Sequence, residues 1–199
     1  MVNEQNWILF EPQEETKTGF IFYPGGRVDY RSYAPVLREI ASQGYLVALV
    51  RMPLSLAVLG ANRAEGVIAA YPEIATWVIG GHSLGGSMAA SYVYNHPDEI
   101  QGLVLWASYP AGSNDLSMYD LRVMSISASQ DGVLNQENFN ATRALLPPDT
   151  QWVSIEGGNH AGFGSYGVQP GDKPSAIAEG EQAAQVAALT VDFLKNGSE

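Results

Sequence analysis

The sequence predicts an α/β protein with a mostly parallel sheet that carries helices on both faces. Short apolar runs alternate with segments of helical spacing along almost the whole chain, which is the pattern of strands joined by helical crossovers. The run 45–50 is apolar without interruption, as expected of a strand that is buried on both faces. The 199 residues suffice for one sizeable core but not for two ordinary domains, so we predict a single domain over residues 1–199.

The expected strands are the short apolar runs that turn residues or charged residues interrupt. Glu11-Pro12 closes the first of them, and Pro24-Gly25-Gly26 closes the second. In chain order the runs are 7–10, 19–23, 45–50, 77–79, 102–106, 121–127 and 152–155.

Helices are expected between these strands. Val36, Leu37 and Ile40 recur at helical spacing ahead of Gly44, a residue type that often ends a helix, and Pro72 stops the next helix. The expected helices are 33–43, 57–71, 87–94 and 136–146. A C-terminal helix should follow, with one apolar stripe made of Ala183, Val186, Ala187, Thr190, Phe193 and Leu194.

The composition excludes several classes of protein. Hydrophobic residues make up 46% and charged residues 16% of the chain, as in folded proteins. There is no cysteine, so disulfides, thiolate catalysis and cysteine-based zinc sites are excluded. The net charge of −11 disfavours binding to nucleic acid. No apolar run approaches the roughly 20 residues of a membrane span. We expect a soluble, by default cytoplasmic protein, exported or membrane-anchored if an upstream segment has been removed.

The segment Gly81-His82-Ser83-Leu84-Gly85 joins the expected strand 77–79 to the expected helix 87–94. It matches G-x-S-x-G in the strand–turn–helix context that this motif requires. Such a turn strains the serine backbone, and only residues without a Cβ fit beside it. We therefore predict that Ser83 is a nucleophile, raised above the sheet edge at the positive end of the helix.

A serine hydroxyl needs a base, and the chain offers three histidines. His82 lies next to the nucleophile along the chain but should project elsewhere, so we expect it to pack or to support the turn. His96 is expected at a surface helix end, far from the carboxyl ends of the strands, where catalytic loops lie. His160 follows the last strand and begins the glycine-rich loop 157–175, which lets its ring reach back to Ser83. We predict that His160 is the base.

The base needs a carboxylate that fixes its tautomer and stabilises the imidazolium. Asp131 follows the expected strand 121–127 and so stands at a carboxyl end. Asp115 and Asp120 compete with it, but both precede that strand. Glu156 is too close to the base along the backbone to orient its ring easily. We predict that Asp131 is the acid.

A tetrahedral intermediate needs two hydrogen-bond donors for its oxyanion. The backbone N–H of Leu84, directly after the nucleophile, is the first candidate. The second should come from the turn after Tyr23, where two glycines leave the backbone open to a ligand. We predict Gly26 for this role, with Arg27 as the alternative.

At this point the chain resembles the α/β-hydrolase superfamily, and more narrowly its small lidless branch related to dienelactone hydrolases. The resemblance extends from about Phe20 to Leu194. It rests on Tyr-Pro-Gly-Gly at 23–26, Gly-His-Ser-Leu-Gly at 81–85, Ser-Gln-Asp-Gly at 129–132 and Gly-Asn-His at 158–160. Dienelactone hydrolases differ at the nucleophile, where they use cysteine.

This resemblance implies an α/β-hydrolase fold with reduced N-terminal strands and no lid domain. It also implies that Ser83, Asp131 and His160 are nucleophile, acid and base, in the chain order of this superfamily. The same resemblance assigns the oxyanion hole to Gly26 and Leu84.

Many relatives of this kind insert a lid where this chain has only residues 107–120, so we expect an open site that favours small acyl groups. Residues expected in loops beside the site supply the candidate pocket walls. The candidate substrate-binding residues are Arg27, Met52, Trp106, Tyr109, Met118 and Phe163.

We therefore expect a serine hydrolase, a carboxylesterase that acts on small-molecule esters through an acyl-enzyme on Ser83, with no metal or organic cofactor. Amide, peptide or lactone hydrolysis could use the same residues. A binding protein that has kept the fold without turnover is the alternative from another class.

Overall fold

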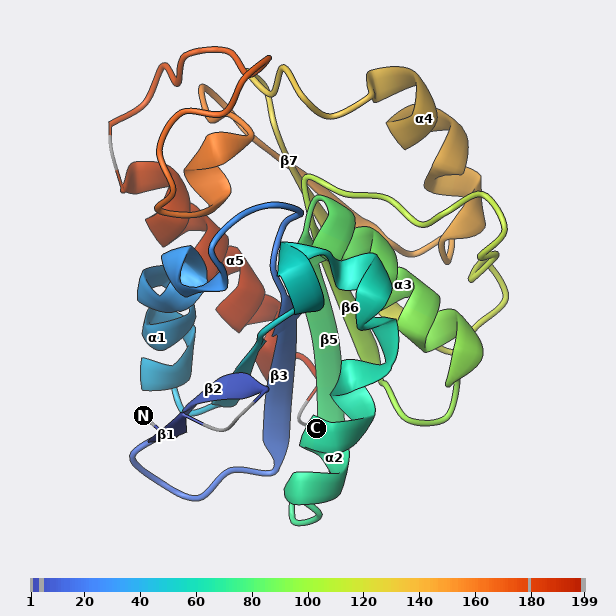
Figure 1. Ribbon diagram of the computed structural model, residues 1–199. Helices are drawn as coiled ribbons and strands as arrows, with labels where there is room; N and C mark the ends of the chain where they lie inside the picture. Colours follow the sequence, from blue (N-terminus) through green and yellow to red (C-terminus); the bar gives the residue numbers. More distant parts are fainter. Residues whose placement is uncertain (1, 4–5, 179, 198–199) are drawn as a thin grey trace.

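The fold is built on one twisted sheet with strand order β1-β2-β4-β3-β5-β6-β7-β8. The computed structural model describes residues 2–3, 6–178 and 180–197 (Figure 1). Its strands are β1 (Val2–Asn3), β2 (Trp7–Phe10), β3 (Thr18–Tyr23), β4 (Leu46–Val50), β5 (Thr76–His82), β6 (Gly102–Trp106), β7 (Arg122–Ala128) and β8 (Gln151–Ile155). β2 pairs antiparallel with β1 and β4, and the remaining neighbours from β4 to β8 pair in parallel.

Helices cover both faces of the sheet (Figure 1). α1 (Ala34–Ser42) and α5 (Glu181–Lys195) lie on one face, and α2 (Ala64–Ala70) and α3 (Leu84–Asn95) lie on the other. Successive residues of a strand point to opposite faces. On β3, Phe20 and Phe22 accordingly join the core beneath α1 and α5, whereas Ile21 joins the core beneath α2 and α3. The predicted α/β class, with a mostly parallel sheet covered on both faces, is confirmed.

One predicted helix is wrong. Residues 57–71 form two short 3₁₀ turns, Ala57–Leu59 and Ala61–Arg63, before α2 begins. Tyr23, at the end of β3, holds this break because its hydroxyl donates to the carbonyl of Ala61 at 2.6 Å and accepts from the N–H of Ala64 at 2.9 Å. Because these hydrogen bonds join the end of β3 to residues 61 and 64, the helical spacing within residues 57–71 could not predict them.

The other predicted helices and strands are present with shifted ends. α3 begins three residues earlier than the expected 87–94, directly after Ser83. The expected helix 136–146 divides into α4 (Gln136–Ala141) and a 3₁₀ turn at Thr142–Leu145. Asn135 caps α4, since its side chain accepts from the N–H of Asn138 at 2.8 Å.

The connection between β6 and β7 holds no lid. All of residues 107–120 are described, and they contain turns but no helix or strand. The long segment after β8 contains one 3₁₀ turn, Ala161–Phe163, and otherwise irregular chain up to α5. Among the described residues, no helix combines the length and the apolar character that a membrane crossing requires.

Candidate active site

Ser83 stands at the sharp turn between β5 and α3, at the carboxyl edge of the sheet. Its backbone has φ 52° and ψ −123°, a strained conformation for a residue that carries a Cβ. The N–H of Ser83 donates to the carbonyl of Trp106 at 2.9 Å, and Ser108 Oγ donates to the Ser83 carbonyl at 2.7 Å. These two bonds tie the strained turn to β6 and to the residues just after it.

The turn is possible because the backbone segments around it pack without intervening side chains. A Cβ on Gly85 would lie 2.2 Å from the carbonyl oxygen of Tyr23, and a Cβ on Gly81 would lie 2.5 Å from the carbonyl carbon of Gly85. Real Cβ atoms do not approach other atoms so closely. The two motif glycines therefore allow α3 to start directly against the end of β3.

His160 and Asp131 form a buried pair. His160 Nδ1 lies 2.7 Å from Asp131 Oδ2, and the two side chains are 1% and 0% exposed. The other carboxylate oxygen of Asp131 accepts the N–H groups of Val133 at 2.8 Å and Leu134 at 2.7 Å. Both oxygens are thus occupied, and the carboxylate is held in one orientation toward the imidazole.

The electrostatic surroundings keep Asp131 ionised. Burial alone would raise its pKa, but hydrogen bonds from His160 and from the backbone N–H groups of Leu134 and Val133 outweigh burial and lower it below the ordinary value. An ionised Asp131 requires the proton of neutral His160 to sit on Nδ1. His160 Nε2 is buried and has no hydrogen-bond partner among the described residues. That nitrogen is therefore the free acceptor of the ring.

His82 lies next to His160 and contacts the side chains of Tyr33 and Phe163. Tyr33 Oη accepts from the N–H of Gly25 at 3.1 Å and shares a hydrogen bond of 2.8 Å with His82 Nδ1. Burial, with a smaller effect from His160, holds the pKa of His82 well below its ordinary value and keeps the ring neutral. The ring centroids of His82 and His160 are 4.5 Å apart. Because His82 is neutral, it adds no positive charge next to the ring of His160. Phe163 stacks on the ring of His82, with centroids 5.3 Å apart.

The turn after β3 leaves one backbone donor free beside the nucleophile. Gly25 donates to Tyr33 Oη and Arg27 donates to the carbonyl of Ser55 at 2.7 Å, whereas the N–H of Gly26 has no acceptor among the described residues. A Cβ on Gly26 would lie 3.0 Å from Leu84 Cδ2, so Gly26 lies next to the side chain of Leu84. The N–H of Leu84 belongs to the first residue of α3 and has no acceptor within the helix.

Ser83 and His160 line one cavity of about 280 Å³. This volume lies just below the range of about 300–1,000 Å³ typical of small-molecule pockets. The remaining lining residues come from the start of α3, from the segment after β6 and from the loop after Asp131. They are Leu84, Ser87, Ala107, Ser108, Tyr109, Val133, Leu134 and Asn135.

Of the six predicted substrate-binding residues, Tyr109 alone is among the residues that line this cavity. Met52, Trp106 and Phe163 are at most 4% exposed and belong to the hydrophobic cores. Met118 is 92% exposed, and Arg27 is also exposed. The structure does not bring these five to the cavity, because strand-end positions can point into the core or out to solvent as well as toward the site.

Several lining residues were missed by sequence reasoning. Ala107 and Ser108 directly follow β6, and the residues 133–135 follow the predicted acid within one short loop. The rule that places active-site loops at the carboxyl ends of strands could have selected both segments. Trp106 and Met118 were selected because they were expected in or next to loops beside the site, and that placement alone did not determine which side chains face the cavity.

The remaining candidate residues lie elsewhere. His96 pairs with Glu65 at 3.4 Å and with Glu99 at 3.5 Å beyond the far end of α3. Asp115 is exposed and accepts the N–H of Ser117 at 3.0 Å. Neither residue lines the cavity at Ser83. Among the described residues, no group of three or more His, Asp or Glu side chains could hold a metal ion.

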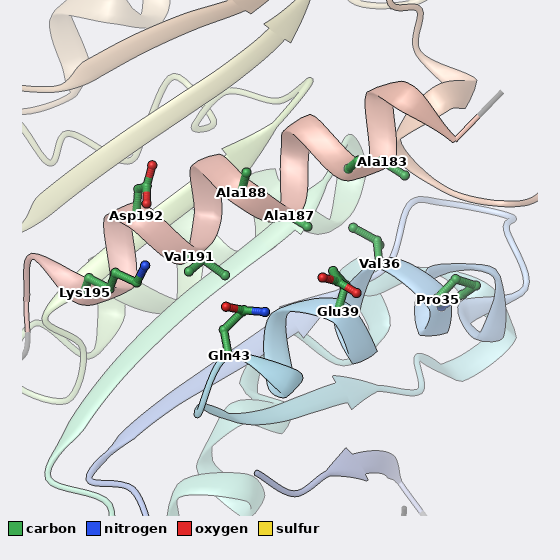
Figure 2. Close-up of a pocket in the computed structure, with 11 residues that line it drawn as sticks. Pro35, Val36, Glu39, Gln43, Ala183, Ala187, Ala188, Val191, Asp192 and Lys195 are labelled. Atoms are coloured by element: carbon green, nitrogen blue, oxygen red, sulfur yellow. The ribbon is translucent and has the colours of Figure 1, made fainter. Parts of the chain in front are cut away.

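A second hollow, of about 490 Å³, lies between α1 and α5 (Figure 2). Small and aliphatic side chains line it, together with the charged side chains of Glu39, Asp192 and Lys195. It is larger than the cavity at Ser83, but none of its lining residues is a serine or a histidine. Ser83 and His160, two of the residues predicted to act in catalysis, line the smaller cavity instead.

Comparison with known families agrees with this geometry. A model of the alpha/beta hydrolase family matches residues 19–184. The chain belongs to this family. The alpha/beta hydrolase fold predicted from the sequence is thereby confirmed, whereas the narrower relation to dienelactone hydrolases is not tested and stays a prediction. A search of curated proteins found no match.

Solved structures of other alpha/beta hydrolases share the fold at low identity. A monoacylglycerol lipase from Paleococcus ferrophilus is 12% identical, with a TM-score of 0.75 over 97% of this chain and 99% of that one. Est1E from Butyrivibrio proteoclasticus, solved with ferulic acid bound, is 13% identical, with a TM-score of 0.72 over 96% and 94%. A predicted CIB-like hydrolase from Thermoplasma acidophilum is 18% identical, with a TM-score of 0.67 over 90% and 87%.

Proposed function

We propose that this alpha/beta hydrolase is a serine carboxylesterase that acts on small-molecule esters with short acyl groups. The observation that carries the proposal is the buried 2.7 Å pair of His160 and Asp131, whose imidazole lines the same cavity as the strained Ser83. Nucleophile, base and orienting acid are the three parts that acyl transfer through a serine requires.

In the proposed acylation step, Ser83 Oγ forms a bond to the ester carbonyl carbon as its proton passes to His160 Nε2. The carbonyl π electrons move to the oxygen, and the backbone N–H groups of Gly26 and Leu84 would stabilise the resulting oxyanion. Ionised Asp131 offsets the charge of the imidazolium that forms beside it. Collapse of the intermediate breaks the bond to the alcohol oxygen, which takes the proton from His160.

Deacylation repeats these steps with water. His160 Nε2 removes a proton from the water as its oxygen bonds to the acyl carbon, and the same two N–H groups would hold the second oxyanion. Collapse releases the carboxylic acid and returns the proton to Ser83. The positive end of α3 lies at this point and favours the negative charge in both steps.

The ester assignment rests on a specific difference from amide hydrolysis. An alkoxide or phenolate leaves more readily than an amine, which must be protonated first, and a small open site provides little binding energy to assist departure. The relatives with solved structures include a monoacylglycerol lipase and a ferulic-acid-bound esterase, which supports an ester as the substrate class.

Steady-state hydrolysis of p-nitrophenyl acetate and of p-nitroacetanilide tests the proposal. We expect rapid turnover of the ester and little of the anilide. Ser83→Ala should lower kcat on the ester by roughly 10⁶-fold, as loss of a catalytic serine does elsewhere. Ser113→Ala, which changes an exposed serine outside the cavity, should leave kcat unchanged.

Two other results of these assays would favour a different function. Faster turnover of the anilide or of a lactone would assign the same residues to amide or lactone hydrolysis. Absence of turnover on all three substrates, in protein that is folded, would favour a binding protein of this fold.

A further inference from the structure

Asp172 lies in the irregular segment after His160 and binds backbone on both sides of the site. Its Oδ1 accepts the N–H of Gly132 at 3.0 Å, and its Oδ2 accepts the N–H of Ala161 at 2.8 Å. Gly132 directly follows Asp131, and Ala161 directly follows His160. One carboxylate therefore joins the loop of the acid to the loop of the base.

Together with two backbone hydrogen bonds nearer the sheet, these bonds lie on both sides of Asp131 and His160 along the chain. Nearer the sheet, Ser129 donates to the carbonyl of Ile155 at 3.1 Å and Gln130 donates to that of Gly158 at 2.8 Å. Both bonds precede Asp131 and His160 along their loops, whereas the bonds to Asp172 follow them. Without the Asp172 carboxylate, the two loops would still meet at the sheet, but they would lose the two hydrogen bonds that follow Asp131 and His160 along the chain.

The segment that carries Asp172 also packs closely against the Asp131 loop. A Cβ on Gly132 would lie 2.5 Å from the carbonyl oxygen of Gly171, so the segment carrying Asp172 rests directly on the backbone of the acid loop. Hydrogen bonds to an ionised acceptor are roughly twice as strong as those between neutral groups. Asp172 does not line the cavity of Ser83, so it acts on the site through the two loops.

We propose that Asp172 is a positioning residue that clamps the Asp131 loop to the His160 loop and so holds the 2.7 Å bond between the two side chains. This inference rests on the proposed function, because the bond matters for turnover only if His160 is the base. A small misplacement of catalytic groups can cost about 100-fold in rate. Loss of the clamp should therefore lower kcat with little effect on KM.

The test compares Asp172→Ala and Asp172→Asn with Asp115→Asn. Asp115 is an exposed loop aspartate that also accepts a backbone N–H, and it lies outside the site. We expect kcat on p-nitrophenyl acetate to fall roughly 10- to 100-fold in both Asp172 variants, with KM within about twofold. Asp115→Asn should change neither constant.

A second measurement does not depend on activity. The proton that His160 Nδ1 shares with Asp131 should give a low-field NMR signal in the unaltered protein. In the Asp172 variants we expect this signal to broaden or move upfield, whereas a residue with a merely structural role would leave it in place. Asp115→Asn should retain the signal of the unaltered protein.

Gly132→Ala examines the same contact from the opposite loop, since its added Cβ would push the Asp172 segment away. It should reproduce the loss of kcat, and it replaces Asp172→Ala if that variant does not fold. Folded Asp172→Asn or Gly132→Ala with unchanged kcat and an unchanged NMR signal would overturn the inference. If the unaltered protein shows the signal but hydrolyses no ester, the proposed function fails while the clamp is still judged by the signal.

Discussion

At the scale of single residues, the site depends on how Asp131 is held. Its two carboxylate oxygens receive three hydrogen bonds, from Val133, Leu134 and His160, and its side chain is 0% exposed. A carboxylate fixed in this way selects one tautomer of the imidazole, with the proton on Nδ1 and the free acceptor on Nε2. The geometry of the acid thus determines which nitrogen is free for Ser83.

Asp131→Asn tests this dependence. The amide has nearly the same shape, but its NH₂ group facing His160 would favour the opposite tautomer. We expect kcat on p-nitrophenyl acetate to fall about 10⁴-fold, as for the corresponding change in other serine triads, with the fold intact by circular dichroism.

The control for this variant is Asp120→Asn, which changes the carboxylate just before β7. It should leave kcat unchanged. Near-normal turnover in Asp131→Asn together with loss in Asp120→Asn would mean that the acid is wrongly assigned.

The residues of this site differ in how far the sequence could predict them. Ser83, Asp131 and His160 each directly follow or lie near the carboxyl end of an apolar run, so the strand pattern alone assigned them to one edge. The roles of Tyr33 and Asp172 depend on hydrogen bonds, to the ring of His82 and to the backbone N–H of Gly132, that span 49 and 40 residues of sequence. No local pattern carries such contacts.

At the scale of elements, β5, the turn at Ser83 and α3 form the unit that presents Ser83, the proposed nucleophile. The start of α3 packs against the end of β3 so closely that Gly85 has no room for a side chain. The expected helix began at residue 87, after two glycines, a residue type with low intrinsic helix propensity. The structure begins it at Leu84, since packing against β3 rather than intrinsic preference stabilises the first turn.

Gly85→Ala should damage this unit. The new Cβ would meet the backbone carbonyls of Tyr23 at 2.2 Å and Pro24 at 2.4 Å, neither of which can rotate away. We expect the free energy of unfolding to fall by about 3 kcal/mol, the upper part of the usual overpacking cost. In a chain of this size that corresponds to a Tm lower by roughly 6–12 °C.

Thermal unfolding followed by circular dichroism measures this change. Gly112→Ala is the matched control, because a Cβ at Gly112 would meet no atom within 4 Å and should leave the Tm within about one degree. Equal Tm values for the two variants would contradict the close packing of α3 against β3.

At the scale of the whole molecule, the alternating sequence pattern was enough to predict the sheet and its two covering layers. The central strands β3, β4 and β6 are mostly apolar runs that are buried on both faces, and such runs are visible in the sequence. The pocket was harder to predict. Phe163 is large and lies near the base, yet it stacks on His82 inside the core, which depends on packing that only the folded chain defines.

The small cavity and the absence of a lid between β6 and β7 predict a preference for short acyl chains. Each buried methylene contributes about 0.8 kcal/mol only while a wall exists to bury it, and a cavity of about 280 Å³ offers little wall. We expect kcat/KM on p-nitrophenyl esters to peak at short acyl chains and to fall for long ones, with no jump in rate above the solubility limit. Highest efficiency on long chains, or activation at an oil–water interface, would show that residues 157–175 supply a wall in the presence of substrate.

The central claim is that Ser83 is a nucleophile activated by His160. Labelling with a fluorophosphonate, followed by intact mass measurement and peptide mapping, tests it most directly because the reagent reports an activated serine whatever the natural substrate is. We expect a single adduct per chain, located on Ser83, and loss of labelling in a folded His160→Ala variant. An adduct on another residue, undiminished labelling in His160→Ala, or no adduct on the folded protein would contradict it.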